Sequence, residues 1–409
     1  STPSAGTSNF RAGVNAGNSI ESGGNFNVVV GDNAGTAITT GDDNVAIGYN
    51  ALDANTTGGN NTAIGTQALT GNTTADDNTA VGKNALKVNT TGNNLVAVGS
   101  GALDANTTAA NNIGIGANAL GVNTTGANNT SVGTNSLDAN TTGASNVALG
   151  YRALSANTTA DNNTAVGTDA LLANTTGIQN TALGAYALDA ATTADGNTAI
   201  GYFGLSATTT GASNTGVGNQ AGAAITTGAE NTAVGAEAGD AITTGAENVA
   251  VGYSALSNAT TASYNTGVGK SSLGSNTTGS QNVAIGMGAG QSQTTGFGST
   301  VVGYKAGYSA TTASGNDSNN TFIGRHSGYS TTTSANNTAV GYNSLEANTT
   351  GTENVAVGSN ALDANTTANG NSALGHGSLG ANTTGAANVA IGTASLQSNT
   401  TASNNTAVG

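Results

Sequence analysis

The stretch from Asn44 to Gly92, NVAIGYNALDANTTGGNNTAIGTQALTGNTTADDNTAVGKNALKVNTTG, contains nearly the same 17-residue unit three times. If Gly48 is taken as position 0, equivalent glycines recur every 17 residues as far as Gly303. One step of 21 residues leads to Gly324, and the 17-residue step then continues to Gly409. Two glycines upstream complete a set of 24, so the repeat covers nearly the whole chain. Each period is called a coil below, and position +4 denotes the fourth residue after its glycine.

The composition differs from that of an ordinary globular domain. Gly accounts for 63 of 409 residues, charged residues for 7%, and Cys and Trp are absent. Such a low content of large apolar residues is typical of disordered chains. A single Pro and strictly periodic apolar residues, however, are not typical of disorder. The absence of Cys excludes disulfides and thiolate metal sites. The net charge of −14 argues against nucleic acid, and no apolar run is long enough for membrane insertion.

The period and its residue types predict an all-β fold. Short β-rich bursts such as TAVG are bounded by Asn and Gly, and a helix would lose about 1 kcal/mol for each Gly. A 17-residue unit of short strands and turns is typical of a parallel β-solenoid, or β-roll, here of about 24 coils. We expect a lead-in over residues 1–8 and one continuous solenoid over 9–409. The four extra residues between Gly303 and Gly324 should form an insertion loop near 313–319, around Ser314–Asn319.

Two apolar columns predict the core. The residue before the coil glycine is Val, Ile or Leu in every coil but the first, and position +4 is Leu in sixteen coils. We expect strands at TAVG and near the Ala-Leu positions, with both columns pointing inward. The predicted core therefore includes Ile47, Leu52, Ile64, Leu69, Val81 and Leu86. Where Gly replaces Leu at +4, position +7 is often Ile, as at Ile20, Ile38, Ile225 and Ile242, which indicates that both positions fill one narrow interior.

Two columns of Asn predict polar ladders. One lies four residues before the coil glycine and the other lies at position +7, and they contain Asn44, Asn61, Asn78, Asn55, Asn72 and Asn89. Asn at a corner tolerates left-handed backbone and can hydrogen-bond to its equivalents above and below. The alternative is N-glycosylation, because Asn55-Thr56-Thr57 fits the acceptor pattern. So many acceptors in one column favour the ladder.

Two further columns keep small side chains. One contains Ala46, Ala63 and Ala80, and the other contains Ala51, Ala68 and Ala85. Strand alternation, counted from an inward Val or Leu, would turn both columns outward. They are then either tight corners or the contact of a close multi-chain bundle. We expect a homo-oligomer, most simply a homotrimer, with these columns at the contact.

The tandem N-[TV]-A-[VI]-G bursts carry a family resemblance. They resemble the repeats in the head domains of YadA-like trimeric autotransporter adhesins, and the longer unit is similar to repeats of phage tail-fibre-like proteins. The resemblance covers residues 9–409, although the coil is longer than the usual adhesin repeat and no neck, stalk, anchor or chaperone domain is seen. It implies a left-handed β-roll in a trimeric fibre on a cell surface or virion, outside the cell. It transfers no site residues.

No pattern in the sequence indicates an enzyme. His326 and His376 lie about three coils apart, which is too far for one metal or one catalytic triad. The sequence has no phosphate-binding loop and no calcium-binding nonapeptide repeat. We therefore expect no cofactor. Calcium remains an alternative at turns that carry Asp42-Asp43, Asp76-Asp77 or Glu230.

The variable positions offer binding residues. Tyr151, Tyr202, Tyr253 and Tyr304 recur three coils apart, and exposed aromatics at a regular rise can contact protein or glycan. Scattered surface tyrosines also occur without function. We expect a fibrous protein that acts as a spacer or attaches to a surface, with an ice- or glycan-binding solenoid as the alternative. The ice-binding alternative would use the Thr-Thr column, which by strand alternation gives a single outward rank.

Overall fold

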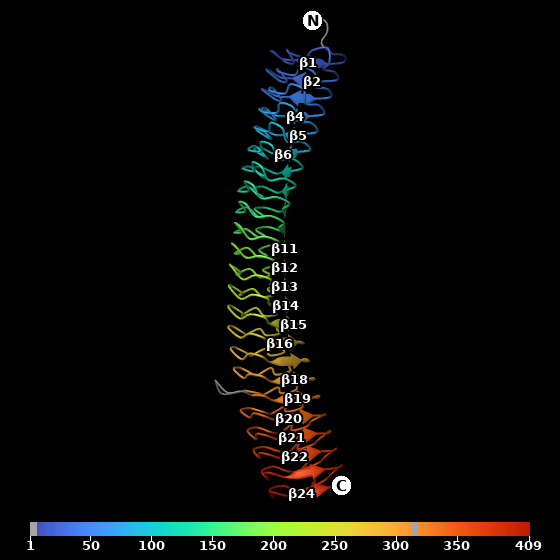
Figure 1. The fold of residues 1–409 in the computed structure, drawn as a ribbon, viewed down its shortest axis with the longest axis vertical. Coiled ribbons are helices and arrows are strands. Elements are labelled where there is room, and N and C mark those ends of the chain that lie inside the picture. Colours follow the sequence, from blue (N-terminus) through green and yellow to red (C-terminus); the bar gives the residue numbers. More distant parts are fainter. Residues whose placement is uncertain (1–5, 312–317) are drawn as a thin grey trace. The chain divides into compact units, whose positions relative to one another are not determined.

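The computed structural model describes residues 6–311 and 318–409. It divides the chain into two compact units, residues 1–199 and 200–409, and both are built from the same coil. Within the described residues every regular element is a strand of three residues, and there is no helix. Each unit is a parallel β-solenoid with one strand in each coil (Figure 1).

The first unit contains eleven complete strands. They are β1 (Phe10–Ala12), β2 (Val28–Val30), β3 (Val45–Ile47), β4 (Thr62–Ile64), β5 (Thr79–Val81), β6 (Val96–Val98), β7 (Ile113–Ile115), β8 (Thr130–Val132), β9 (Val147–Leu149), β10 (Thr164–Val166) and β11 (Thr181–Leu183). The boundary between the units falls within β12 (Thr198–Ile200).

The second unit contains the other twelve strands. They are β13 (Thr215–Val217), β14 (Thr232–Val234), β15 (Val249–Val251), β16 (Thr266–Val268), β17 (Val283–Ile285), β18 (Thr300–Val302), β19 (Thr321–Ile323), β20 (Thr338–Val340), β21 (Val355–Val357), β22 (Ser372–Leu374), β23 (Val389–Ile391) and β24 (Thr406–Val408).

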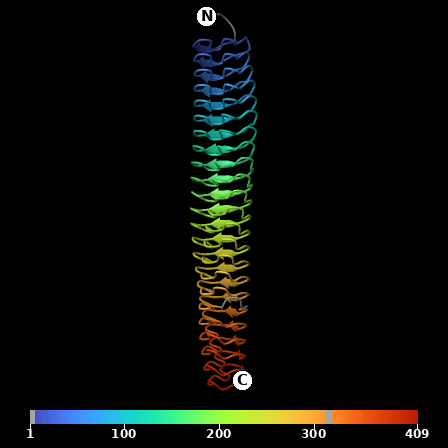
Figure 2. The same cartoon turned by 90° about the vertical axis from the view of Figure 1, so that its left-hand side faces the viewer.

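Strands of successive coils pair in parallel, each residue with its equivalent. Thr62 pairs with Thr79 in the first unit, and Thr232 pairs with Val249 in the second. Figure 2 shows the strands of each unit lying side by side as one ladder, with the turns to either side. The predicted repeat unit and parallel stacking are confirmed. The handedness that the resemblance implies stays a prediction.

The 21-residue step does not disturb the pairing. Thr300 pairs with Thr321, and Val302 pairs with Ile323, so the four extra residues add no strand to the described part of this coil. Most of the predicted insertion loop lies outside the described residues. Its described end is anchored by the backbone amides of Ser318 and Asn319, which both donate to the carbonyl of Phe297.

The predicted second strand near the Ala-Leu positions is wrong, because the chain forms turns there. All sixteen leucines at position +4 have φ between 49° and 54°, which is the left-handed region and incompatible with a strand. The seven glycines at this position have φ between 53° and 61°. A bulky residue held there costs about 1–3 kcal/mol of strain, and burial of Leu contributes about 1.5–3 kcal/mol. The two effects are similar in size, which explains why Leu and Gly exchange at this position.

The predicted orientation of the strand is also wrong. Ala46, Ala63 and Ala80 are fully buried, whereas Ile47 and Ile64 are each 37% exposed and Val81 is half-buried. Where Leu occupies position +4, the interior has no room for a large side chain at the strand centre. In a coil with Gly216 at the strand centre, an added Cβ would already lie 2.8 Å from Cγ of Leu205. A methyl group therefore fills the space, and the aliphatic residues on either side of it face outward.

The small columns are thus interior positions. Ala51, Ala68 and Ala85 have no exposed surface, like the Ala column of the strands. The prediction that these columns face outward and form the contact between chains is wrong, because no second chain can reach them in the folded coil.

The leucine column is the part of the predicted core that is confirmed. Leu52, Leu69 and Leu86 are fully buried. The predicted exchange with Ile at +7 is confirmed as well. A Cβ on Gly222 would lie 2.9 Å from Cδ1 of Ile225, and one on Gly239 would lie 2.9 Å from Cδ1 of Ile242. The isoleucine therefore fills the space that the leucine leaves.

Phe322 and Gln293 fill the interior of coils that lack both Leu and Ile. Phe322 sits at the centre of β19 and is fully buried, and a Cβ on Gly307 or Gly328 would come within 3.0 Å of its ring. Gln293 is also buried, and its amide donates to Asn282 Oδ1 at 2.8 Å and to the carbonyl of Gly296 at 3.0 Å. The interior of this segment is therefore filled without Leu at +4 or Ile at +7.

The two Asn ladders are confirmed. Asn61 accepts the backbone amide of Asn78 at 3.1 Å, and its own backbone amide donates to Asn44 Oδ1 at 3.0 Å. In the other column Asn72 donates through Nδ2 to Asn55 Oδ1 at 2.9 Å. The predicted members Asn44, Asn55, Asn61, Asn72, Asn78 and Asn89 have no exposed surface. Because Nδ2 of Asn55 donates inside the coil to Gly58, a glycan on this atom is incompatible with the fold.

The coil glycine is required for two separate reasons. All 24 have φ between 117° and 143°, where residues with a side chain are strained. In addition, a Cβ on Gly48 would lie 2.6 Å from the carbonyl oxygen of Gly65 in the next coil. The glycine therefore permits both the bend after the strand and the close approach of successive coils.

Changing Asn72 to Asp tests the inner ladder with an almost isosteric substitution. The carboxylate loses both donated hydrogen bonds, to Asn55 Oδ1 and to the carbonyl of Ala75, and faces two acceptors instead. We expect a loss of about 3 kcal/mol or more in the free energy of unfolding at pH 7, measured by chemical denaturation. Asn60→Asp is the matched control, because exposed Asp43 and Asp77 occupy the same coil position naturally. Equal effects of the two substitutions would show that the ladder does not stabilise the fold.

Candidate binding surfaces

Each coil presents three outward surfaces. The strand face consists of the first and third residues of every strand. The variable face consists of positions +1, +2 and +5, where the residue type changes from coil to coil. The Thr corner consists of positions +8 and +9. The fold fixes the spacing on all three surfaces, because every coil repeats at the strand spacing of about 4.8 Å.

The strand face is at least partly exposed in both units, and it carries an apolar column, the third residue of every strand from β2 onward, beside a first-residue column of mainly Thr and Val. Its most exposed members include Leu149 at 46% and Leu183 at 47% in the first unit, and Leu374 at 51% in the second. Sequence reasoning assigned the third residue of each strand, such as Ile47, Ile64 and Val81, to the core. It therefore missed this exposed surface. The sequence signal for this surface was the pattern of the strand, in which Ala lies between Thr or Val on one side and Val or Ile on the other. This pattern is also typical of a strand whose small central residue points inward.

The strand face is hollowed near its end in the second unit. The hollow has a volume of about 320 Å³ and is lined almost entirely by apolar atoms. Its lining residues are Val355, Val357, Ser372, Ala373, Leu374, Val389 and Ile391. A side chain of Val, Ile or Leu size from another molecule fits such a space.

The predicted tyrosines lie on the variable face. Tyr151, Tyr202, Tyr253 and Tyr304 are all exposed, between 42% and 50%. Their spacing of three coils keeps them apart, so the fold does not gather them into one site. Three of them lie next to cations instead: Arg152 is 5.2 Å from the Tyr151 ring, Lys270 is 5.7 Å from Tyr253, and Arg325 is 6.0 Å from Tyr304. Whether they bind a ligand stays a prediction.

One group of side chains on the variable face is more extensive than sequence reasoning indicated. It is called the Tyr304 cluster and consists of Tyr304, Lys305, Tyr308, Arg325, His326, Tyr329 and Tyr342. These residues come from positions +1, +2 and +5 of three consecutive coils. The sequence signal was present, but it emerges only when three columns are read together across the 21-residue step.

Among the described residues, two acid–base pairs occur on the variable face. Arg152 donates from Nε and a terminal nitrogen to both carboxylate oxygens of Asp169, at 2.8 and 2.9 Å. His326 Nδ1 lies 3.8 Å from Glu346 Oε1. Both pairs join neighbouring coils, which is the arrangement expected of cross-strand surface pairs.

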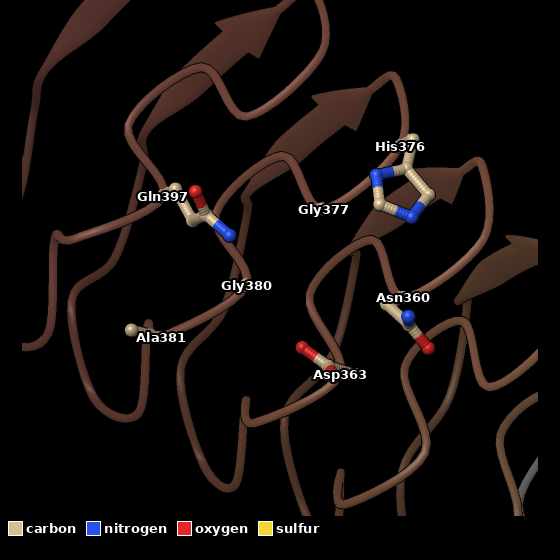
Figure 3. Close-up of a pocket in the computed structure, with 7 residues that line it drawn as sticks. All are labelled: Asn360, Asp363, His376, Gly377, Gly380, Ala381 and Gln397. Atoms are coloured by element: carbon tan, nitrogen blue, oxygen red, sulfur yellow. The ribbon is translucent and has the colours of Figure 1, made fainter.

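A polar hollow lies around His376. It has a volume of about 320 Å³ and is lined by Asn360, Asp363, His376, Gly377, Gly380, Ala381 and Gln397. Figure 3 shows the four longer side chains around the backbone of Gly377 and Gly380. The hollow lies at the coil of Gly375, the one coil in the sequence that carries Gly at both +2 and +5.

Six aspartates share position +5 of the variable face. They are Asp53, Asp104, Asp138, Asp189, Asp240 and Asp363, and partial burial raises the pKa of each above the ordinary value of 3.8. Hydrogen bonds from backbone amides act in the opposite direction but are smaller influences. These carboxyl groups therefore hold a proton more tightly in the folded chain than in the unfolded chain.

The Thr corner exposes one of its two hydroxyl columns. Thr56 Oγ1 donates to the carbonyl of Thr73 in the next coil at 3.0 Å, and Thr73 repeats the bond to Thr90 at 3.2 Å. Thr57 and its equivalents at position +9 are exposed. The corner therefore presents a single rank of outward Thr, as the sequence predicts.

The acidic turns considered for calcium bond to the backbone. Asp42 Oδ1 accepts the amide of Asn25, and Asp76 Oδ1 accepts the amide of Gly59. Over residues 6–311 and 318–409, no group of three or more His, Asp or Glu side chains is placed to hold a metal ion. The same residues contain no helix of the length and apolarity that a membrane span needs.

Comparison with known proteins does not identify this chain. No protein-family model and no curated protein matches its sequence. The resemblance to adhesin heads and tail-fibre repeats therefore rests on the repeated motif residues.

The aspartate column predicts an unusual dependence of stability on pH. Because the pKa is raised in the folded state, the free energy of unfolding increases as pH falls from 7 through the folded pKa values toward 3.8. We expect the melting temperature to rise over this window, followed by circular dichroism. Changing all six aspartates to Asn should flatten the rise.

A control variant separates this effect from net charge. It replaces six exposed aspartates by Asn, namely Asp32, Asp43, Asp76, Asp77, Asp161 and Asp195. It removes the same number of charges but leaves the +5 column intact, so it should retain the rise. Loss of the rise in both variants would attribute it to general charge repulsion.

Proposed function

We propose that this protein is a fibrous, non-enzymatic surface protein that associates with further copies of itself and serves as an attachment fibre or spacer. The observation that carries the proposal is the apolar column of the strand face, the Val, Ile or Leu that ends each strand from β2 to β24 in both units. Monomeric soluble proteins seldom expose a long continuous apolar surface, and such surfaces typically mark interfaces. In this proposal, the stacked coils give the fibre its length, and the strand faces form the contact between copies.

A second copy of the same chain is the partner that fits this face best. Its side chains recur at the same strand spacing of about 4.8 Å, so ranks of Val, Ile and Leu from two copies can interdigitate along their length. No partner with a different repeat would keep this match over many coils. A trimer, which the adhesin-head resemblance implies, would bring three strand faces toward a common axis.

The remaining features support a role outside catalysis and outside the cell. The acid–base pairs Arg152–Asp169 and His326–Glu346 join neighbouring coils, and they do not converge on a cavity. The chain has no Cys, so it folds without disulfides and is compatible with extracellular conditions. The proposed site of action is a cell surface or a virion fibre. There, a repetitive structure can hold a binding surface at a distance from the point where the protein is attached.

Binding to ice or another ordered solid is the second candidate function. The strand face is a better candidate surface for it than the Thr corner. Nearly every strand presents two outward ranks, Thr or Val in the first and Val, Ile or Leu in the third position. The Thr corner presents one. An ice-recrystallisation assay with the monomeric and assembled protein distinguishes this candidate, because a face occupied by other copies cannot also bind a crystal.

The self-association test uses charge substitutions on the strand face. Leu149, Leu183, Ile285, Leu374 and Ile391 are changed to Lys, which places like charges where the copies would meet. We expect wild-type protein to sediment as a multiple of 38.9 kDa and the variant to sediment as a monomer. Circular dichroism checks that both remain folded.

The matched control changes five equally exposed apolar residues of the variable face to Lys. These residues are Tyr49, Tyr151, Tyr202, Tyr253 and Met287. This variant adds the same charge and should assemble like wild type. A wild-type monomer, or equal loss of assembly in both variants, would contradict the proposed interface.

A further inference from the structure

The Tyr304 cluster concentrates chemistry that is scarce elsewhere in the chain. Residues 304–342 contain four of the ten Tyr, two of the seven Lys and Arg, and one of the two His. The cluster lies within the second unit, on the variable face, and is built only from described residues. Because its columns are distinct from the strand face, its role does not depend on self-association.

The cluster has an outer row that faces solvent. The guanidinium of Arg325 lies between the rings of Tyr304 and Tyr342, at 6.0 and 5.5 Å from their centres. Both tyrosines remain exposed, at 42% and 45%. Since they stand two coils apart, their separation along the stack is about 10 Å.

An inner row supports the outer one. Tyr308 and Tyr329 stack face to face, with centres 5.2 Å apart and planes at 5°. Between the rows, Lys305 Nζ lies 5.0 Å from the Tyr308 ring and 5.6 Å from Tyr304. The His326 ring lies 5.0 Å from Tyr329 and 5.7 Å from Tyr304. These contacts hold the side chains in place, which lowers the entropy cost of binding a ligand.

The local charge is opposite to that of the chain. Between Glu247 and Glu346 the sequence contains one acidic residue, Asp317, and three cations, Lys270, Lys305 and Arg325. This segment therefore has a net charge of +2, and the rest of the chain has a net charge of −16, which together give the total of −14. The nearest described carboxylate is Glu346, which lies beside His326. An anionic ligand that the rest of the surface repels is attracted here.

We propose that the Tyr304 cluster binds an acidic polysaccharide of the uronic-acid type. Tyr rings offer apolar surface to the C–H groups of sugar rings, and their hydroxyl groups offer hydrogen bonds to sugar hydroxyls. Lys305 and Arg325 supply charge-assisted donors for the carboxylates. The spacing of Tyr304 and Tyr342 is close to the length of two sugar rings in an extended chain. A nucleic acid fits less well, because its affinity depends on many cations along the phosphate backbone.

The test titrates oligogalacturonides into the wild-type protein by isothermal calorimetry, with uncharged galacto-oligosaccharides of equal length as the reference. We expect the acidic oligosaccharide alone to bind, with affinity that falls as salt is added. Changing Lys305 and Arg325 together to Gln should weaken binding by about tenfold or more, because two charge-assisted contacts are lost. Tyr342→Ala should weaken it further while leaving the coil interior unchanged.

The control variant changes Tyr253 to Ala and Lys270 to Gln, which removes a tyrosine–cation pair of the same kind that lies outside the cluster. It should bind like wild type. The proposal is overturned if no acidic oligosaccharide binds, if the uncharged one binds equally, or if the control loses as much affinity as the cluster variants. Stronger binding of single-stranded oligothymidine than of oligogalacturonide would assign the cluster to nucleic acid instead.

Discussion

The structure depends on one constraint: each coil completes its hydrogen bonds only with the coils next to it. A three-residue strand cannot form a sheet alone, and a buried Asn cannot be satisfied within its own turn. Thr62, for example, donates its backbone amide to the carbonyl of Asn78 in the next coil, while the amide of Asn78 in turn donates to Asn61 Oδ1. Any residue that shifts one coil against its neighbour breaks several bonds at once, which explains why the period is 17 residues in all but two steps and why the strands stay paired across both exceptions.

This constraint divides the coil into fixed and free positions. The glycine, the strand-centre Ala, the Leu or its replacement, and the two Asn columns all point inward or bend the chain, so their identity is restricted. Positions +1, +2 and +5 lie outside and vary, and both the Tyr304 cluster and the hollow at His376 arise there. The fold therefore offers a regular frame on which different surfaces can be placed without cost to the interior.

Periodicity predicts the fold class, the burial of Leu52, Leu69 and Leu86, and both Asn ladders, because each follows from a column whose residue type hardly changes. It does not predict which strand residues point inward. The direction of the strand residues depends on the space that Leu at +4 leaves in the interior. This Leu occupies the interior only because its φ is near 50°, a conformation that is uncommon for residues other than Gly. Ile47 and Ile64 were misplaced for this reason. The Tyr304 cluster was missed because its members are far apart in sequence and meet only through stacking.

Site-resolved hydrogen exchange of the folded protein tests the central claim most directly, because exchange reports which amides are bonded between coils. If inter-coil bonds hold the fold, amides such as Thr62, Gly65 and Leu69, which donate to neighbouring coils at 2.8 to 2.9 Å, are protected, and protection recurs with a period of 17 residues. Rapid exchange at these positions, or protection without that period, would contradict the account.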